Sequence, residues 1–492
     1  MESWIVISLF IAAYLAVTLA IGLLAGRRAT RSVAGYVAAD RSFGLLVMYF
    51  ITGATVFSSF AFLGGPGWTY SRGAAAFYIL SYGVLGMAPF YWIGPRVAAL
   101  GRRDGFVTQA QLLRGRFPSR GLSALVALLS LVAFIPYVTI QIRGAGIVIE
   151  AVTAGNVPLW LGALVAYGIV LIYVLASGAM AVGWTNTFQG IFMVVIAWTL
   201  GLYLPWRLYG GIGPMFEQLA TQRPELLTTP GLAADGSSWG WGPYSSYILV
   251  SAVGLMAWPH LFMKAFTAKD DDTLRRTVIL FPTFQLFLIP VFLIGFSGVL
   301  FPGGGPDDPD FILPFMVLNV ELPTLVVGLF CAGALSASMS TGDALLHAAA
   351  SVVVEDGIGP FRALTEDTQQ LLMRVVVLTV GAVAYWGAVA GGSSLVQLLA
   401  TAYGIVSQLA PPIVAALYWR RATTAGVMAG LLAGWFTALL FYLNPEWKPF
   451  GIHEGVLGLL VHVPVLVAAS LATTAQEEAH AERFCGKVEA TA

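Results

Sequence analysis

The sequence predicts an all-α integral membrane protein with about 13 transmembrane helices. Of its 492 residues, 58% are hydrophobic and only 10% are charged, whereas about a quarter of the residues in soluble domains are charged. Apolar runs of about 20 residues, long enough to cross a hydrocarbon core of ~30 Å as a helix, recur along the chain. No segment alternates as a membrane β-barrel strand does.

The expected spans follow one another through mostly short connections. The first span follows Glu2 and has no small-residue cleavage site, so we expect it to be retained rather than removed as a secretory signal. We place the spans approximately at 3–25, 43–70, 74–95, 121–150, 157–177, 181–206, 241–263, 275–301, 314–350, 372–391, 394–418, 425–443 and 453–474.

The basic residues are distributed unequally between the two sides of this topology. With the N-terminus outside, the inner side holds 20 of the 25 Lys and Arg residues, Lys264 among them. The outer side holds 4, and Arg143 falls inside a span. The positive-inside rule therefore predicts an outer N-terminus and a cytoplasmic C-terminus. We expect a multi-pass protein of the plasma membrane.

Two spans are interrupted by Gly and Pro. They read ITGATVFSSFAFLGGPGWTY at 51–70 and SAVGLMAWPHLFMKAF at 251–266. An interrupted helix in hydrocarbon persists only where protein or a bound ion satisfies its freed backbone groups. Discontinuous helices in corresponding positions of two halves indicate an inverted-repeat transporter. The alternative is that Gly and Pro are simply common in membrane helices.

Five motifs follow one another over nearly the whole chain. They are DRSFG at 40–44, TQAQLLRGRF at 108–117, SGAMAVGWTNTFQG at 177–190, WPHLFMKAFTAKD at 258–270 and ALSASMSTGDALL at 334–346. In this order they resemble the motifs of the sodium:solute symporter family. The resemblance implies a LeuT-like core of two inverted five-helix repeats, in which the first and sixth core helices are discontinuous.

The resemblance also divides the chain into six parts. We expect an extra N-terminal transmembrane helix with an inner loop, a first repeat, an outer loop, a second inverted repeat, two extra transmembrane helices and a short cytoplasmic tail. Their bounds are 1–42, 43–210, 211–240, 241–419, 420–474 and 475–492.

The family resemblance implies a sodium site where the first core helix meets the eighth. Sodium is a hard cation that prefers oxygen ligands, as calcium and magnesium do. Membrane-helix hydroxyls otherwise bond to the preceding turn or to a neighbouring helix, which is the alternative here. The implied ligands are the carbonyls of Ala54, Phe57 and Ala337 and the hydroxyls of Ser340 and Thr341.

Asp343 lies three residues beyond Ser340, and a carboxylate within a span is a functional candidate by default. Family members with a second sodium often carry Asp in a WTD motif, where this sequence has Asn186 in WTN. We expect Asn186, Ser340 and Asp343 to form a second cation or proton site. Alternatively, Asp343 pairs with a polar neighbour near the inner mouth.

The substrate is expected to be a small organic solute, such as a monocarboxylate or a related organic anion like pantothenate. Arg143 is a candidate to hold a substrate carboxylate bidentately; alternatively it reaches the membrane surface or pairs with an acidic neighbour. The other substrate candidates are expected to face the centre and are Thr52, Ser58, Ser59, Gln141, Trp258, Tyr403 and Gln408.

Other functional classes are disfavoured. The sequence has no metalloprotease His spacing, no nucleophile elbow and no phosphate-binding loop, so we do not expect an enzyme, and Na⁺ is the one ion implied. Zero net charge without basic patches argues against nucleic acid. We expect a functional monomer in the lipid bilayer. A proton-coupled carrier of the same fold stays an alternative, as does a solute sensor, although only about 18 residues follow the final span.

Overall fold

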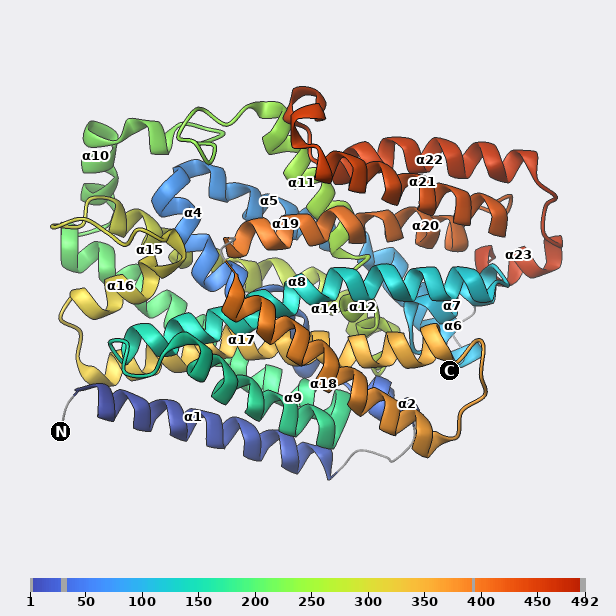
Figure 1. Ribbon diagram of the computed structural model, residues 1–492, viewed down its shortest axis with the longest axis horizontal. Coiled ribbons are helices and arrows are strands. Elements are labelled where there is room, and N and C mark those ends of the chain that lie inside the picture. Colours follow the sequence, from blue (N-terminus) through green and yellow to red (C-terminus); the bar gives the residue numbers. More distant parts are fainter. Residues whose placement is uncertain (1–2, 28–32, 392–393, 487–492) are drawn as a thin grey trace.

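The structure is a computed structural model that describes residues 3–27, 33–391 and 394–486 (Figure 1). Within these ranges every regular element is a helix, and the only strand-like features are isolated bridges at Phe43 with Ala268 and at Leu232 with Ser238. The all-α prediction is confirmed. Of the basic residues assigned to the inner side, Arg28, Arg31 and Lys487 lie outside the described residues, as do parts of the expected N-terminal loop and tail.

Ten helices in the described part of the chain are long and apolar enough to cross a membrane. They are α1 (Ser3–Gly26), α8 (Arg120–Val152), the two halves of α9 (Leu159–Tyr209), α14 with α15 (Asp271–Gln285 and Leu288–Val299), α17 (Thr324–Ser351), α18 (Glu366–Ala390), α19 with α20 (Leu395–Val406 and Ala410–Tyr418), α21 (Thr424–Leu443) and α22 (Glu454–Ala472).

Two bent pairs of helices raise the number of candidate spans in this part of the chain to twelve. The first pair bends by 56° after α3 (Leu45–Val56), and the second bends by 44° between α11 (Trp241–Leu255) and the short helices α12 (Pro259–Phe262) and α13 (Lys264–Thr267). These are the two spans that Gly and Pro interrupt in the sequence.

The exact count of thirteen spans stays a prediction. The expected span 74–95 is divided, because α5 (Phe77–Met87) ends just before Pro89 and α6 (Phe90–Asp104) begins after it. The remaining short helices are α2 (Val33–Ala38), α4 (Gly65–Arg72), α7 (Gln109–Arg116), α10 (Ile212–Gln222), α16 (Ile312–Asn319) and α23 (Glu478–Cys485).

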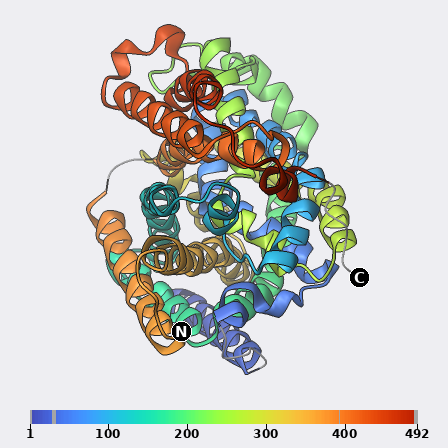
Figure 2. The ribbon, with the colours of Figure 1, turned by 90° about the vertical axis from the view of Figure 1, so that its right-hand side faces the viewer.

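The long helices run roughly along one axis of the bundle (Figure 1). The helices α6, α7 and α23 lie at one end of this axis, and α10 and α16 lie at the other. α17 runs through the middle and packs against α1, α8, α9 and α18. α21 and α22 pack against each other at the edge farthest from α1, as the view along the bundle in Figure 2 shows.

The bridge at Phe43 connects the two bent spans. The Phe43 N–H donates to the Thr267 carbonyl at 3.1 Å, and the Lys269 N–H donates to the Phe43 carbonyl at 2.9 Å. Phe43 lies one residue before Gly44, the N-cap of α3, and Thr267 ends α13. The start of the first bent span is therefore bonded to the end of the second.

Gly178 separates the two spans within α9. Its φ of 57° and ψ of −143° are non-helical, so the chain turns between Leu159–Ala176 and Gly178–Tyr209 without a loop. A Cβ atom at this position would lie 2.6 Å from the Tyr36 carbonyl oxygen. Glycine is therefore required both by the backbone conformation and by the close approach of α2.

We predict that Gly178→Ala destabilises the protein by about 1–3 kcal/mol, the cost of holding an L-residue in a sparsely populated backbone region, before the contact with Tyr36 is counted. The matched control is Gly168→Ala in the same helix, where an added Cβ meets nothing within 4 Å. Thermal unfolding in detergent measures both. Equal melting temperatures for the two variants would contradict the prediction.

Candidate functional site

The break in the first bent span is held by side chains from two other helices. α3 ends at Val56, and a π-helical turn resumes at Phe60–Gly64. The Ser59 N–H donates to the Gln141 Oε1 of α8 at 3.0 Å. The Ser340 hydroxyl of α17 donates to the Ala54 carbonyl at 2.9 Å. Two of the backbone groups freed by the break, the Ser59 N–H and the Ala54 carbonyl, thus find partners within the protein.

A glutamine side chain from another helix also bonds to the break in the second bent span. α11 ends at Leu255, and α12 begins at Pro259. Between them, the Ala257 carbonyl accepts a hydrogen bond from Gln109 Nε2 of α7 at 3.1 Å. A buried glutamine therefore supports each break.

Oxygen atoms from α3 and α17 converge beside the first break. The Thr341 hydroxyl donates to the Thr55 carbonyl at 3.1 Å and lies 3.4 Å from the Ala54 carbonyl. The Ser340 hydroxyl also lies 3.4 Å from the Ala337 carbonyl. Both hydroxyls are fully buried. Four of the five predicted sodium ligands are thus joined in one hydrogen-bonded group, to which the structure adds the Thr55 carbonyl.

Phe57, the fifth predicted ligand, is the C-cap of α3. Among the described residues its carbonyl accepts no hydrogen bond, so an oxygen acceptor is free at the break. The donor set as a whole contains only carbonyl and hydroxyl oxygens, which suits a hard cation. Since a hydroxyl can rotate its hydrogen away, Ser340 and Thr341 can turn lone pairs toward an ion without moving the helices.

Asp343 is fully buried next to this group. Its Oδ2 accepts hydrogen bonds from the Tyr173 hydroxyl at 2.9 Å and the Thr185 hydroxyl at 3.2 Å. Asn186 of α9 donates to the Ser340 carbonyl at 2.8 Å and to the Thr55 hydroxyl at 3.3 Å. In the described part of the chain, Asp343 Oδ1 and Asn186 Oδ1 are both buried without a hydrogen-bond partner.

Lys264 was assigned to the inner basic loops, but the structure corrects this. It lies in α13 with only 8% of its surface exposed, because α12 and α13 continue the bent span within the bundle after its 44° bend. It is within electrostatic reach of Asp343. It also lines a small cavity with Thr52 and another with His347. The sequence feature that could have indicated a buried lysine is its position within the mostly apolar stretch that follows Pro259.

Aromatic rings gather beside the second break. The Trp258 ring lies 5.0 Å from that of Tyr137 and 5.6 Å from that of Tyr403, and the Tyr403 ring lies 5.5 Å from that of Tyr82, between ring centres. The Trp258 Nε1 is buried and has no hydrogen-bond partner among the described residues. Of the predicted substrate residues, Trp258 and Tyr403 are therefore in contact.

The other predicted substrate residues divide into two groups. Thr52, Ser58 and Ser59 are buried in or beside the first break, and Gln141 is bonded to it. Gln408 is not brought to them, because its amide bonds to the Gly455 carbonyl at 2.9 Å and to His462 Nδ1 at 3.2 Å, both on α22. It joins α19 and α20 to the C-terminal helix pair instead.

Arg143 forms an ion pair with Asp308 at 3.3 Å, in the segment that precedes α16. This contact matches the alternative in which Arg143 pairs with an acidic neighbour. In the same segment, Asp310 Oδ2 accepts a hydrogen bond from the Leu395 N–H at 3.0 Å. Burial raises the pKa of Asp310 to about 6. Its protonation below that pH weakens this link to α19, since a neutral carboxyl accepts more weakly than a carboxylate.

Comparison with known proteins identifies the family. The profile described as the sodium:solute symporter family matches residues 36–434. The chain belongs to this family. As a sodium:solute symporter it is a sodium-coupled transporter and not an enzyme, and sodium is its coupling ion. With its many apolar helices, it is a multi-pass protein of the plasma membrane that carries a small-molecule solute.

Relatives of this symporter extend over almost its full length. It is 28% identical to the uncharacterized symporter YhjB of Bacillus subtilis, over 94% of this chain and 96% of the relative. It is also 28% identical to the sodium/pantothenate symporter of Escherichia coli, over 91% and 93%. A sodium/proline symporter of Staphylococcus aureus is 26% identical, over 94% and 92%.

Solved structures confirm the fold. A Na⁺-coupled sialic acid symporter in its substrate-bound outward-open state matches with a TM-score of 0.79 at 16% identity, covering 96% of this chain and 98% of the other. Mhp1, a nucleobase-cation-symport-1 family transporter, matches with a TM-score of 0.57 at 15% identity, over 91% and 98%. The sodium:solute symporter described here therefore has the LeuT-like fold that its sequence predicts.

We predict that Ser340→Ala and Thr341→Ala each raise the half-saturating sodium concentration roughly tenfold or more, since a polar contact to a charged group contributes about 1.5–3 kcal/mol. The measurement is the Na⁺-dependent increase in melting temperature, with choline as the ionic-strength control. It needs no knowledge of the solute.

Ser351→Ala is the matched control for these two variants. Ser351 is buried on the same helix, but its hydroxyl donates to the His347 carbonyl of its own helix at 3.0 Å. We expect its sodium dependence to equal that of the unaltered protein. A shift for Ser351→Ala as large as that for Ser340→Ala would place the sodium ligands elsewhere.

Proposed function

We propose that this symporter takes up a small organic anion together with sodium, by alternating access. The class is a monocarboxylate or a related acid such as pantothenate. The observation that carries the proposal is Lys264, a cation buried in the second half of a broken helix and sharing a cavity with Thr52. Asp343 lies within electrostatic reach of Lys264, but no ion pair joins the two among the described residues, so a substrate carboxylate can supply a direct negative partner.

One relative supports the same class, since it is named for pantothenate, an organic anion. Another is named for proline, a zwitterion that carries a carboxylate but no net negative charge. The aromatic rings around Trp258 suit the apolar body of such a solute, since small-molecule sites are mostly apolar with a few placed polar groups. Arg143 is the weaker candidate for the carboxylate, because it is already paired with Asp308.

The proposed topology has an outer N-terminus, a cytoplasmic C-terminus, and inverted repeats at 43–210 and 241–419 within a functional monomer. The end of the bundle that bears α6, α7 and α23 carries Arg96, Arg102 and Arg103, which supports its assignment to the cytoplasm. Each proposed repeat begins with one of the two bent spans, which supports the division of the core into repeats at 43–210 and 241–419.

An anionic solute makes the number of cations important. One charge crossing 100 mV gains about 2.3 kcal/mol, and a tenfold sodium gradient gains about 1.4 kcal/mol. One sodium carried with one carboxylate moves no net charge, so the gradient alone supports only about tenfold accumulation. A second cation restores the contribution of the membrane potential.

Asn186, Ser340 and Asp343 are proposed as the site of that second cation, which is sodium or a proton. The unpartnered oxygens of Asp343 and Asn186 support this, because buried polar atoms are normally bonded.

Uptake into proteoliposomes tests the proposed function. A labelled panel of lactate, pyruvate, pantothenate, proline and glucose is supplied with an inward Na⁺ gradient, a proton gradient or neither, each with and without an inside-negative potential. We expect uptake of at least one of the monocarboxylates that depends on Na⁺. Uptake of proline or glucose alone would reject the anionic class, and uptake driven only by protons would reject sodium coupling.

We predict that Asp343→Asn lowers thermal stability and removes the dependence of anion uptake on membrane potential. Removing the carboxylate weakens the electrostatic compensation of Lys264, which lies within reach of it. The double variant Asp343→Asn/Lys264→Met should recover the stability. Potential-dependent anion uptake by Asp343→Asn would exclude Asp343 from the second cation site.

A further inference from the structure

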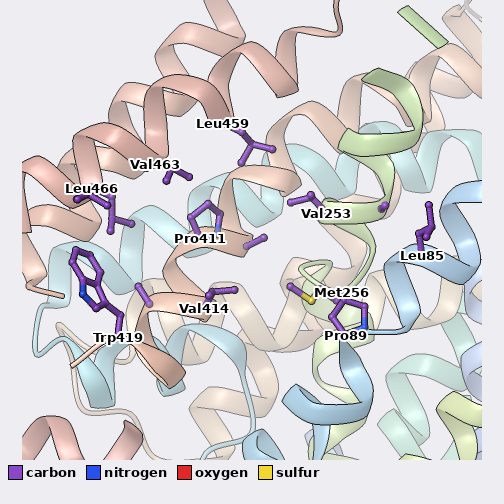
Figure 3. Close-up of a pocket in the computed structure, with 14 residues that line it drawn as sticks. Leu85, Pro89, Val253, Met256, Pro411, Val414, Trp419, Leu459, Val463 and Leu466 are labelled. Carbon is purple, nitrogen blue, oxygen red and sulfur yellow. The ribbon is translucent and has the colours of Figure 1, made fainter. Parts of the chain in front are cut away.

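A deep apolar groove opens on the membrane-facing side of the bundle, between α5, α11, α20 and α22 (Figure 3). Its volume is about 520 Å³, within the range of ~300–1,000 Å³ typical of ligand sites. Leu85, Val414 and Val463 line it and are each more than 40% exposed. We call it the acyl groove. The side chains of Pro411, Leu459 and Trp419 point toward it (Figure 3).

A second cavity of about 740 Å³ adjoins this groove and shares Pro89, Met256 and Val414 with it. It differs in being lined by Arg96 and Arg275. We call it the basic pocket. It lies at the end of the bundle that bears α6, which we propose to be cytoplasmic.

Aromatic rings mark the same level of the membrane. Trp92 and Tyr418 also line the basic pocket and are 68% and 48% exposed. Trp and Tyr gather where the hydrocarbon meets the headgroups. The two joined cavities therefore run from hydrocarbon depth to headgroup level.

The two arginines are available to an anion. The Nε and Nη2 atoms of Arg96 donate to the Phe484 and Gly486 carbonyls, and its guanidinium lies 5.0 Å from the centre of the Tyr418 ring. These contacts fix the side chain, and none of them uses Nη1. Arg275 is exposed and has no ion pair or hydrogen bond among the described residues.

One carboxylate also lines the basic pocket. Asp271 is there, but it pairs with Arg102 at 2.6 Å, so its charge is already compensated. The uncompensated charges lining the basic pocket are therefore both positive.

We propose that the acyl groove and the basic pocket together bind one anionic glycerophospholipid. Its phosphate sits between Arg96 and Arg275, and one acyl chain fills the groove. Basic pockets between membrane helices on the cytoplasmic side recognise anionic headgroups in this way. The lipid belongs to the leaflet at the α6 end of the bundle. That this leaflet is the cytoplasmic one rests on the topology given under the proposed function.

Met256 gives this lipid a route to the transport cycle. It lies in the break between α11 and α12, and it borders the acyl groove, the basic pocket and the small cavity that holds Thr52 and Lys264. A bound acyl chain thus contacts the discontinuous helix at its break.

Native mass spectrometry of the purified full chain tests the site. The probes are dioleoylphosphatidylglycerol and dioleoylphosphatidylcholine, added in equal amounts without solute. We expect the protein to retain dioleoylphosphatidylglycerol in preference to dioleoylphosphatidylcholine. Since each arginine near an anionic headgroup contributes about 1 kcal/mol, or roughly fivefold in affinity, Arg96→Gln/Arg275→Gln should lose about 25-fold in retention. Val414→Trp, which fills the junction of the two cavities, should lose binding of the same lipid.

Two control variants match these changes. Arg276→Gln removes the neighbouring charge, which pairs with Asp272 at 2.8 Å and does not line the pocket. Leu440→Trp adds the same bulk to α21, on a residue that is 47% exposed and lies outside the groove. Both should retain the lipid as the unaltered protein does. If the double arginine variant does not fold, Arg275→Gln alone carries the test, with an expected loss of about fivefold.

Three outcomes would overturn the proposal. They are equal retention of the two lipids, equal retention by the arginine variants and the Arg276→Gln control, and displacement of the lipid by millimolar glycerol 3-phosphate, which would indicate a site for soluble phosphate. The binding assay contains neither a Na⁺ gradient nor solute. Failure of lipid binding is therefore distinguishable from failure of organic-anion uptake.

Discussion

The architecture of this symporter depends on one constraint: peptide groups freed inside hydrocarbon must find partners within the protein. Gln141 and Gln109 meet this need at the two breaks, and Ser340 bonds a carbonyl at the end of α3. The carbonyl that Ser340 bonds, that of Ala54, is also a proposed sodium ligand. At the proposed site, sodium binding would require the Ser340 hydroxyl to turn its hydrogen away from that carbonyl.

A second constraint is charge. Lys264 and Asp343 are buried in different helices, α13 and α17, and they are within electrostatic reach of each other. They form no direct ion pair among the described residues, but their opposite charges partly offset each other. A solute carboxylate or a cation that enters this region changes the balance of the pair. The free energy of binding a charged solute or cation therefore depends on the charges of Lys264 and Asp343, where the broken helices meet α17.

Much of this arrangement could be predicted from the sequence. Gly and Pro interruptions identified both broken spans, because few residues permit a break in a membrane helix. The spacing of Ala337, Ser340 and Thr341 put all three within about one helical turn, and the family resemblance supplied their partner carbonyls. The order of the spans and the all-α class follow directly from hydropathy.

The features that sequence reasoning missed depend on how the helices are oriented in three dimensions. Lys264 follows an apolar motif and was predicted to begin a basic loop, yet it lies in α13 and is buried within the bundle. Gln408 lies on the expected helix but faces α22 instead of the centre. Arg143 meets Asp308 across 165 positions of sequence, a contact that no local pattern encodes. Each of these outcomes is decided by tertiary packing.

The short bridge between Phe43 and the end of α13 has a mechanical consequence. Two backbone hydrogen bonds fasten the first discontinuous helix to the second at a single point. If the bundle opens at that end, the two discontinuous helices must either move together or break both hydrogen bonds. Movement of the two helices as one rigid unit therefore costs less free energy than their separation.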